Sequence, residues 1–500
     1  MGKKSKKLKQ LHRSLAVQHH AGYVDGTKTK AAEAATSKTS AQRPFDRTPG
    51  YVLARARGKE ERQRVPRAWL GEWPLRRESA GALDLLFAQD ENRLSYLVPE
   101  RHARMAANPF SFFRGAAAVM AADLATQPRT DIVVQACGDA HIANFGGYRS
   151  PESHLVFDLN DFDETSRAPW EWDVKRLVAS VAICGRYRGF GEDWCRSATR
   201  LAAESYRRAL RSFADQGALD VWRAYIDVTE VLQALADRAS KADRRQVIVD
   251  LERAFAKTNE RAFDKLVAQR DGAPEMVYDP PDIVPLSYFL SPANVHRVQE
   301  SLTCLMQGYR SSVLPTYQPL LENYQMIGVA QKVVGVGSVG TRCWVAAFVG
   351  TEVPDPLVLQ IKEANASVLE RWCGPSPYAS HGERVVQGQR LMQTTSGILL
   401  GWTSAPDEND QRRDYYVRQL WNWKMSVDLE KVSADELEVY SQLCAWTLAR
   451  AHARTGDRGA IAGYMGKSDA FDEAMASFAL AYADQNERDY EAFLKRIGTD

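Results

Sequence analysis

Two short stretches of the chain carry polar side chains whose types and spacing suit phosphate and metal chemistry. In the first, residues 137–144 (CGDAHIAN), a Gly-Asp turn follows the apolar run 132–134, and an Asn lies five positions after Asp139. A carboxylate on such a loop can take the proton of a hydroxyl nucleophile. A second apolar run, 155–157, leads into the acidic stretch 158–164. Asn and carboxylate oxygens are hard ligands that suit Mg²⁺ with a phosphate chain rather than zinc.

The second stretch lies far along the chain, at residues 333–341. It contains three glycines and a serine, and these are Gly335, Gly337, Ser338 and Gly340. Because a strand-like run follows instead of a helix, the spacing disfavours a Rossmann phosphate loop and favours a hairpin whose backbone N–H groups approach phosphates. Lys362 ends the apolar run 357–361, where an ammonium needs an anionic partner or a route to solvent.

Each of these signals also has a structural interpretation. Gly-Asp at a strand end is a common turn that Asn144 could cap, and an acidic run is commonly a solvated loop. The acid that pairs with Lys362 is left open between Glu370 and Glu383, and Glu383 is preferred. Its predicted helix, 383–393, also offers Gln387 and Gln389. Arg104 and Arg114 could reach phosphates, although ion pairs with nearby acids are expected for both.

The composition restricts the class of protein. Of 500 residues, 45% are hydrophobic and 26% are charged, and the net charge of +2 makes no case for a nucleic-acid partner. Seven cysteines without a C-x-x-C pair argue against a zinc site or a disulfide framework and favour the cytoplasm. No apolar run approaches the roughly 20 residues that a membrane helix needs. Residues 1–48 are basic and polar and are predicted to be a disordered tail.

Predicted helices surround the first stretch. Residues 50–130 have helical character, with a packed helix over 116–124, and the chain is predicted to be helical again from 172 to about 270. Four prolines between 274 and 285 predict a loop, and a further helix is expected over 298–309.

The second half is predicted to be richer in strands. The expected strands are residues 343–349, 357–362, 397–403 and 415–420. Ser433 and Glu436 form a capping box that opens a long helix, which Gly456 can end. Residues 471–497 are expected to form one or two more helices.

The first stretch resembles the small-molecule branch of the kinase-like fold, the aminoglycoside, choline and homoserine kinases. Those proteins carry Gly-Asp-x-His-x-x-Asn, then Asp-x-Asp at a strand end, then Gly-Pro-x-x-x-Asp-Leu. The last segment appears here as residues 168–174 (APWEWDV). Aligning it places the metal-binding Asp at Asp161, with Asp163 beside it, and leaves Asp158 outside. The same resemblance implies that Asp173 is a buried orienting carboxylate.

The resemblance also assigns roles to the other groups. It implies that Asp139 acts as the base, with the Mg²⁺ ligands Asn144, Asp161 and Asp163. Lys362 and the glycine hairpin would hold the phosphates of ATP. Residues 419–421 would lie near the hinge that holds adenine. Cys137 stands where the family has a His before Gly-Asp, and that position is mainly structural there.

The two stretches occur in the reverse of the usual kinase order. A circular permutation accounts for this, because folds tolerate one where the old termini lie close together. The helix over 434–454 would then pack back under the catalytic loop; Gly456-Asp457 follows it, but Ala462 replaces the Asn of a second loop. The expected class is α+β: a two-lobed, protein-kinase-like fold with a mostly helical large lobe and a small antiparallel β lobe. The predicted divisions are a tail (1–48), the large lobe (49–325), the small lobe (326–425) and C-terminal helices (426–500).

Nearly the whole chain after the tail is also similar to a bacterial family known as domain of unknown function 2252. The residues that carry this similarity are Arg104-Met105, Pro109-Phe110, Arg114-Gly115 and residues 138–141, 144–146, 158–164 and 389–393. The similarity implies a kinase-like fold and names no substrate.

These patterns lead to the expectation of an ATP- and Mg²⁺-dependent phosphotransferase with an unidentified hydroxyl acceptor. Three alternatives stay open: a nucleotide-binding pseudokinase or regulator, a metal-dependent phosphoester hydrolase that uses Asp139, His141, Asp161 and Asp163, and an AMP transferase. The main expectation requires that Lys362 and Asp161 face each other across one cleft.

Overall fold

The structure is a computed structural model that describes residues 48–74, 76, 80–231, 258–289, 291, 295–333, 335, 337–353, 355–407, 410–420 and 425–498. The chain divides into two compact units, residues 1–53 and 54–500. Helix α3 (Pro49–Arg64) begins in the first unit. The predicted tail lies, apart from Thr48, outside the described residues.

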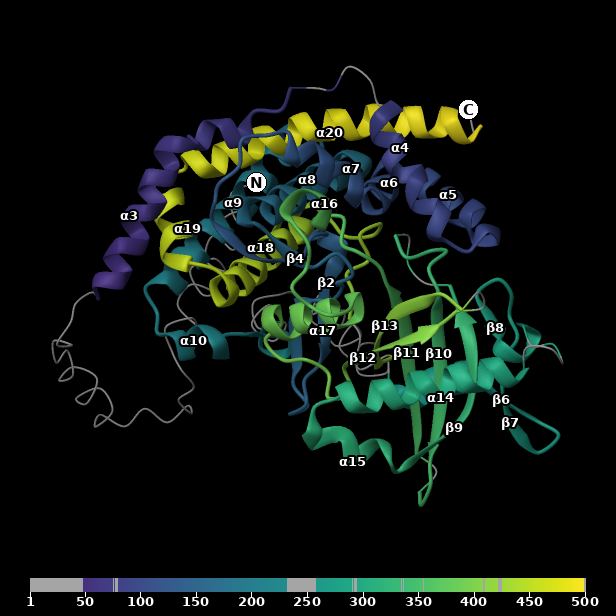
Figure 1. Cartoon of the computed structure of the whole chain (residues 1–500). Coiled ribbons are helices and arrows are strands. Elements are labelled where there is room, and N and C mark those ends of the chain that lie inside the picture. Colours follow the sequence, from purple (N-terminus) through teal and green to yellow (C-terminus); the bar gives the residue numbers. More distant parts are fainter. Residues whose placement is uncertain are drawn as a thin grey trace, which may run out of the picture. The chain divides into compact units, whose positions relative to one another are not determined.

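A group of helices forms the largest hydrophobic core. These helices are α6 (Pro109–Gly115), α7 (Ala117–Ala125), α8 (Trp170–Tyr187), α9 (Glu192–Ala214), α10 (Ala218–Arg223), α18 (Ala434–Thr455), α19 (Arg458–Met465) and α20 (Ala470–Ile497). Helices α4 (Ala80–Ala88) and α5 (Val98–Ala106) pack in a separate, smaller cluster with Phe112 and Phe493. Helix α8 lies at the centre, because every side chain from Trp170 to Gly185 is buried and α9, α18 and α20 all pack against it (Figure 1). Such an all-round buried helix is expected at the middle of a core rather than at its surface.

Two small antiparallel sheets lie against these helices. In one, β1 (Val133–Ala136) pairs with β4 (Ser166–Pro169). In the other, β3 (Leu155–Leu159) lies between β2 (Phe145–Arg149) and β5 (Ile226–Asp227). The loop 137–144 therefore connects β1 to β2, and the loop 160–165 connects β3 to β4, so both emerge from the same pair of sheets.

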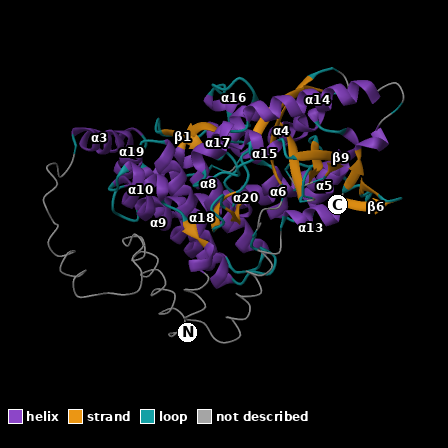
Figure 2. Cartoon of the chain, turned by 90° about the horizontal axis from the view of Figure 1, so that it is seen from below, coloured by secondary structure: helices purple, strands orange, loops and turns teal. Residues whose placement is uncertain are grey.

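Most of the described strands in the second half of the chain belong to one six-stranded antiparallel sheet. Its strands, in spatial order, are β12 (Gly401–Pro406), β13 (Arg412–Gln419), β11 (Pro356–Ala364), β10 (Cys343–Gly350), β9 (Tyr324–Lys332) and β8 (Ile283–Pro285). Figures 1 and 2 both place these strands beside α14 (Val295–Ser312), apart from the group of α8, α9 and α18. The short helices α15 (Gln318–Leu321) and α16 (Glu370–Cys373) and the longer α17 (His381–Met392) complete this half.

The two faces of this sheet pack against different helices. Leu359 and Ile361 of β11 share a core with Tyr309 of α14. The alternate residue Val358 packs instead with Leu266 of α13 (Asn259–Leu266), because successive side chains of a strand point to opposite faces. Lys362 is on the same face as Val358, and this is the face that turns toward the loops of the small sheets.

The connection from the sheet back to the helices runs through residues 420–425. Leu420 N donates to Val358 O (2.9 Å), and Met425 exchanges two backbone hydrogen bonds with Gly147 (2.8 and 2.9 Å). Residues 421–424, which include one end of the predicted hinge, lie outside the described residues. The described ends nevertheless tie β13 to β2.

Most of the predicted elements are confirmed. The helix over 116–124, the strand pairs around the glycine hairpin and the capping box at Ser433 are present, and residues 471–497 form one helix. The prediction of helix from 172 to about 270 is wrong at β5 and at β6 (Val267–Arg270). The proline-containing stretch forms β7 (Ala273–Met276) and β8 instead of a loop, because β6 and β9 supply hydrogen-bonding partners from outside it.

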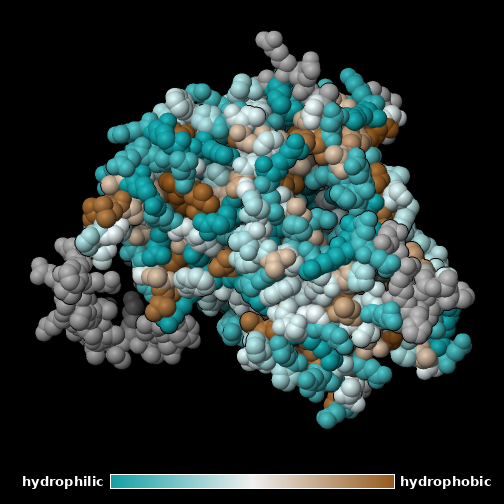
Figure 3. Space-filling view, in the orientation of Figure 1, coloured by the Kyte–Doolittle hydropathy of each residue, from teal (hydrophilic) through white to brown (hydrophobic). Residues whose placement is uncertain are grey.

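In the described part of the chain no helix combines the length and apolar character that crossing a membrane requires. On the face shown in Figure 3, hydrophobic side chains form small separate patches among hydrophilic ones.

Candidate active site

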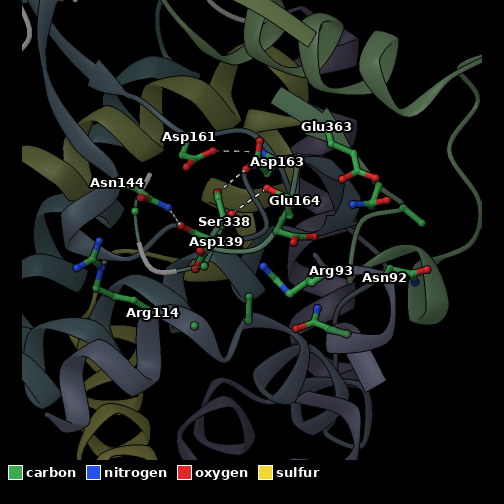
Figure 4. Close-up of a pocket in the computed structure, with 18 of the residues that line it drawn as sticks. Asn92, Arg93, Arg114, Asp139, Asn144, Asp161, Asp163, Glu164, Ser338 and Glu363 are labelled. Atoms are coloured by element: carbon green, nitrogen blue, oxygen red, sulfur yellow. Dashed lines mark hydrogen bonds between the residues drawn. The ribbon is translucent and has the colours of Figure 1, made fainter. Parts of the chain in front are cut away.

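The predicted residues from both stretches meet at one cavity of about 480 Å³. Its lining includes Asp139, Asn144, Asp161, Asp163, Gly335, Gly337 and Ser338. Figure 4 shows Asp161, Asp163, Glu164 and Ser338 close together, with Asn144 and Asp139 next to them. Three other predicted residues, Lys362, Gly340 and Glu383, do not line it. The structure thus brings most of the candidate residues together.

The loop 137–144 is held by a buried carboxylate from helix α8. Asp173 accepts hydrogen bonds from Cys137 N (2.6 Å) and Gly138 N (2.9 Å), and His452 of α18 lies 3.2 Å from the same carboxylate. Gly138 has φ +80°, and a Cβ there would lie 2.2 Å from Glu164 O, so only glycine fits this turn. The buried, loop-orienting position predicted for Asp173 is confirmed.

Helix α18 also holds this loop. The Tyr440 hydroxyl donates to the carbonyl oxygens of Ile142 (2.8 Å) and Phe145 (3.0 Å), which flank Asn144. The expectation that this helix packs under the loop is therefore confirmed. Side chains of both α8 and α18 therefore hold the loop 137–144 in place.

Asp139 is paired with an arginine that the sequence pattern did not single out. Arg176 of α8 lies with Nε and Nη2 each 2.8 Å from Asp139 Oδ1, and it also donates to Phe113 O (2.8 Å). Burial raises the pKa of Asp139, and the Arg176 guanidinium opposes this rise. His141 Nε2 lies 3.5 Å from the other oxygen. Burial and two neighbouring arginines keep the pKa of His141 well below its usual value, which makes it a neutral neighbour.

Asn144 and Asp161 are the side chains best suited to hold Mg²⁺. Asn144 Nδ2 donates to Asp139 O (2.8 Å), which leaves its Oδ1 as the atom available to a cation. The Asp161 carboxylate is 35% exposed and faces the cavity. Burial and the nearby Asp163 raise the pKa of Asp161, so a cation there would relieve repulsion. Among the described residues no group of three or more His, Cys, Asp or Glu could hold a metal ion, and Mg²⁺ commonly uses one or two carboxylates plus phosphate oxygens.

Both carboxylate oxygens of Asp163 have protein partners. It accepts hydrogen bonds from Lys362 Nζ (2.6 Å), the Tyr416 hydroxyl (2.6 Å) and the Ser338 hydroxyl (3.2 Å). Burial alone would raise the pKa of Asp163, but the Lys362 ammonium and these hydrogen bonds lower it below its usual value. Asp163 is therefore an anchor for Lys362 rather than a free metal ligand.

Lys362 projects from β11 toward the acidic loop. Its ammonium lies 2.6 Å from Asp163 and 3.8 Å from Asp161, and its side chain is only 3% exposed. The required closeness of Lys362 and Asp161 is thus present. The preferred pairing with Glu383 is wrong, because Glu383 accepts from Ala379 N (3.2 Å) at the start of α17. The other acid considered, Glu370, lies 3.2 Å from Arg384.

The glycine hairpin joins β9 to β10, as predicted, and α5 and its preceding turn hold it in place. Arg104 Nη1 donates to Gly335 O (2.9 Å), Leu94 N donates to Gly340 O (2.8 Å), and the Arg93 guanidinium donates to Val339 O. These hydrogen bonds were not predicted from the sequence, because nothing in residues 93–104 indicates a contact with a distant hairpin. Residues 334 and 336, inside the hairpin, lie outside the described residues.

Two further acids near the site have structural contacts. Asp158, the acid that the alignment left outside, is buried and lies 2.6 and 2.8 Å from Nη2 of Arg450. Glu164 lines the cavity and accepts from Val368 N (2.7 Å), and burial raises its pKa to about 7. Glu164 was visible in the sequence only as part of an acidic run.

The two arginines flagged in the sequence have different surroundings. Arg104 pairs with Glu100 (2.6 Å), as expected. Arg114 lines the cavity and forms no ion pair with any described residue, so the expectation of a salt bridge is wrong for it. Figure 4 places Arg114 on the same side of the cavity as Asn144.

Comparison with known proteins gives one match. A family model described as "Uncharacterized protein conserved in bacteria (DUF2252)" matches residues 93–496, which is well over half of the chain. No curated protein and no solved structure matches the chain.

Proposed function

This chain belongs to the DUF2252 family, and we propose that it is an ATP- and Mg²⁺-dependent phosphotransferase acting on a hydroxyl acceptor. The observation that carries the proposal is the position of the Lys362 ammonium, 3.8 Å from Asp161 and 2.6 Å from Asp163. A buried lysine between two acids, beside a glycine hairpin and a Gly-Asp loop, matches the parts that phosphoryl transfer needs.

In this proposal each group has one task. Asn144 Oδ1 and the Asp161 carboxylate hold Mg²⁺, which would neutralise charge on the phosphate chain. Lys362, kept in place by Asp163, binds phosphate oxygens, and backbone N–H groups of the hairpin cover the chain. Asp139 orients the acceptor hydroxyl and takes its proton. Most of the acceleration would come from positioning and charge neutralisation.

The kinase-like, two-lobed and circularly permuted arrangement is part of the same proposal. Three observations support it: the lysine strand faces the acidic loop, residues 420 and 425 tie the sheet to β2, and Tyr440 of the late helix α18 braces the early loop. A permuted kinase-like chain requires all three contacts. The division at residues 325 and 425 stays a prediction; β8, which precedes residue 325, belongs to the six-stranded sheet.

The test is release of ADP in a coupled assay with Mg-ATP and a panel of hydroxyl acceptors, namely sugars, amino alcohols, aminoglycosides and a serine peptide. Thermal shift with Mg-ATP on wild type, Asp161→Ala and Lys362→Ala runs in parallel. The proposal expects a ligand-induced shift in wild type that both variants lose. It also expects that Asp139→Asn keeps the shift and loses transfer. Absence of a shift in wild type would contradict nucleotide use.

One observation favours a second function, a nucleotide-binding regulator without transfer. Asp139 is already paired with Arg176 at 2.8 Å, and this ion pair opposes the pKa rise that burial gives Asp139, so the carboxylate is a weaker base than burial alone would make it. This alternative expects a Mg-ATP shift in wild type without ADP release for any acceptor. An Asp139→Asn variant would then be indistinguishable from wild type in every ligand assay.

A further inference from the structure

The cavity is lined by a cation that the proposed mechanism does not use. Arg114 lies in the last turn of helix α6 and lines the cavity together with Asp139, Asn144 and Asp161. The residue is half-buried, its buried Nε has no hydrogen-bonding partner, and it forms no ion pair or hydrogen bond through its side chain with another described residue. Withdrawing a guanidinium from water without a partner is costly, because the lost hydration must be offset by pairing.

Arg114 is partly withdrawn from water. Burial lowers the pKa of its guanidinium, and the negative charges of Asp139 and Asp161 only partly offset that effect. By contrast, Arg176, the other arginine at Asp139, has both the carboxylate and the Phe113 carbonyl as partners. Of the two arginines beside the proposed base, Arg176 has protein partners and Arg114 has none among the described residues.

We propose that Arg114 forms an oxyanion subsite on the Asp139 side of the cavity, separate from the Lys362 site, that binds a phosphate-like group. Lys362 is 3% exposed and is held by Asp163, so it can reach at most one end of a phosphate chain. Arg114 lines the cavity near Asn144 (Figure 4), whereas Lys362 is not among the lining residues. A planar guanidinium with free N–H groups matches tetrahedral oxyanions by two-point hydrogen bonding.

Two ligands could supply this group. One is the terminal phosphoryl group of ATP, which Arg114 would contact as it transfers. The other is an anionic group carried by the acceptor. Both place a negatively charged oxygen within reach of Asp139, and both give Arg114 the partner that it lacks. This inference rests on the proposed function for the identity of the nucleotide but not for the existence of the subsite.

The binding experiment measures dissociation constants by calorimetry for Mg-ATP, Mg-ADP, and inorganic phosphate with and without Mg-ADP. Charge-assisted hydrogen bonds of this kind are expected to change affinity on the order of 10- to 100-fold. If Arg114→Ala weakens Mg-ATP by that factor and leaves Mg-ADP within about twofold, the subsite takes the terminal phosphoryl group. If it weakens only inorganic phosphate, the subsite takes an acceptor group. Arg188→Ala, which removes an arginine that donates to the Leu429 and Val432 carbonyls and does not line the cavity, is the matched control.

Failure of the subsite and failure of the proposed function give different results. If wild type binds inorganic phosphate in an Arg114-dependent way but binds no nucleotide, the subsite stands and phosphotransfer from ATP falls. If Arg114→Ala leaves all affinities unchanged, or if wild type binds none of these probes, the subsite is overturned.

A second readout does not depend on any ligand. Arg114 has no ion-pair partner among the described residues, so its removal leaves no opposite charge unpaired, and we expect Arg114→Met to unfold at the same temperature as wild type or higher. Arg176→Met should unfold at a lower temperature, because it leaves Asp139 without its partner. A clear loss of thermal stability in Arg114→Met would mean that Arg114 has a structural role instead.

Discussion

The pairing of Lys362 with Asp163 predicts a division of labour between two acids that lie two positions apart. We consider Asp163→Asn and Asp161→Asn, which remove one negative charge each with almost no change of volume. Asp163 contacts the ammonium directly at 2.6 Å, whereas Asp161 lies 3.8 Å away. The first variant should therefore affect folding, and the second should affect mainly ligand binding.

The magnitude follows from burial. Breaking a buried ion pair by removing one partner costs about 3–5 kcal/mol. Asp163 is 28% exposed and Asp161 remains nearby, so we expect a cost just below that range. An asparagine can also still accept from the Tyr416 hydroxyl. For Asp163→Asn we therefore expect a loss of about 2–3 kcal/mol in the free energy of unfolding. For Asp161→Asn, which is more exposed and relieves repulsion, we expect a change within about 1 kcal/mol.

The assay is urea unfolding without nucleotide at pH 7.5, followed by tryptophan fluorescence and circular dichroism. Asp163→Asn should move the midpoint clearly to lower urea, while Asp161→Asn should stay close to wild type. Equal shifts in the two variants, or a larger shift for Asp161→Asn, would refute the assignment of Asp163 as the anchor of Lys362.

Three other perturbations follow from the same contacts. Asp158→Asn leaves the buried Arg450 without its carboxylate partner and should cost about 3–5 kcal/mol of unfolding free energy. Calorimetry on the folded variant should show no selective loss of Mg-ATP binding. Burial raises the pKa of Glu164 to about 7. The folded state therefore holds a proton that the unfolded state loses above its pKa of about 4.5, and the stability of wild type falls as the pH rises from about 4.5 to 7. Glu164→Gln should gain up to about 3 kcal/mol of unfolding free energy over wild type at pH 8 and nothing at pH 4, and equal gains at both pH values would contradict this. Gly138 has a positive φ, and an alanine Cβ there would lie 2.2 Å from Glu164 O. Gly138→Ala should therefore lower the melting temperature and abolish ADP release. A fully active variant would show that the loop is not fixed as described.

Local patterns predicted the parts of the site that depend on local chemistry. The Gly-Asp loop, the acidic strand end and the glycine hairpin are each set by a strand that stops and a turn that follows, and such patterns are readable in sequence. The capping box at Ser433 is readable for the same reason, because both its hydrogen bonds lie within one turn of helix.

The errors concern partners that lie far apart in the chain. Lys362 and Asp163 are 199 positions apart, and nothing in the sequence near either residue favours Asp163 over Glu383. Arg176 looked like one more residue of a buried helix, although it pairs with Asp139. Strands β6 to β8 were missed because β6 and β7 pair with each other and β8 pairs with β9, and none of these pairings shows in the strands' own periodicity. Contacts of this kind are set by the packing of whole elements.

The central claim is that the acidic pocket and Lys362 hold one phosphate chain together with Mg²⁺. The most direct test is calorimetric titration of ATP into wild type, Asp161→Asn and Lys362→Met, with and without Mg²⁺. The account predicts tight binding to wild type only with Mg²⁺, loss of the Mg²⁺ dependence in Asp161→Asn, and weak binding in both conditions for Lys362→Met. Binding to wild type that is equally strong without Mg²⁺, or absent in both conditions, would contradict the account.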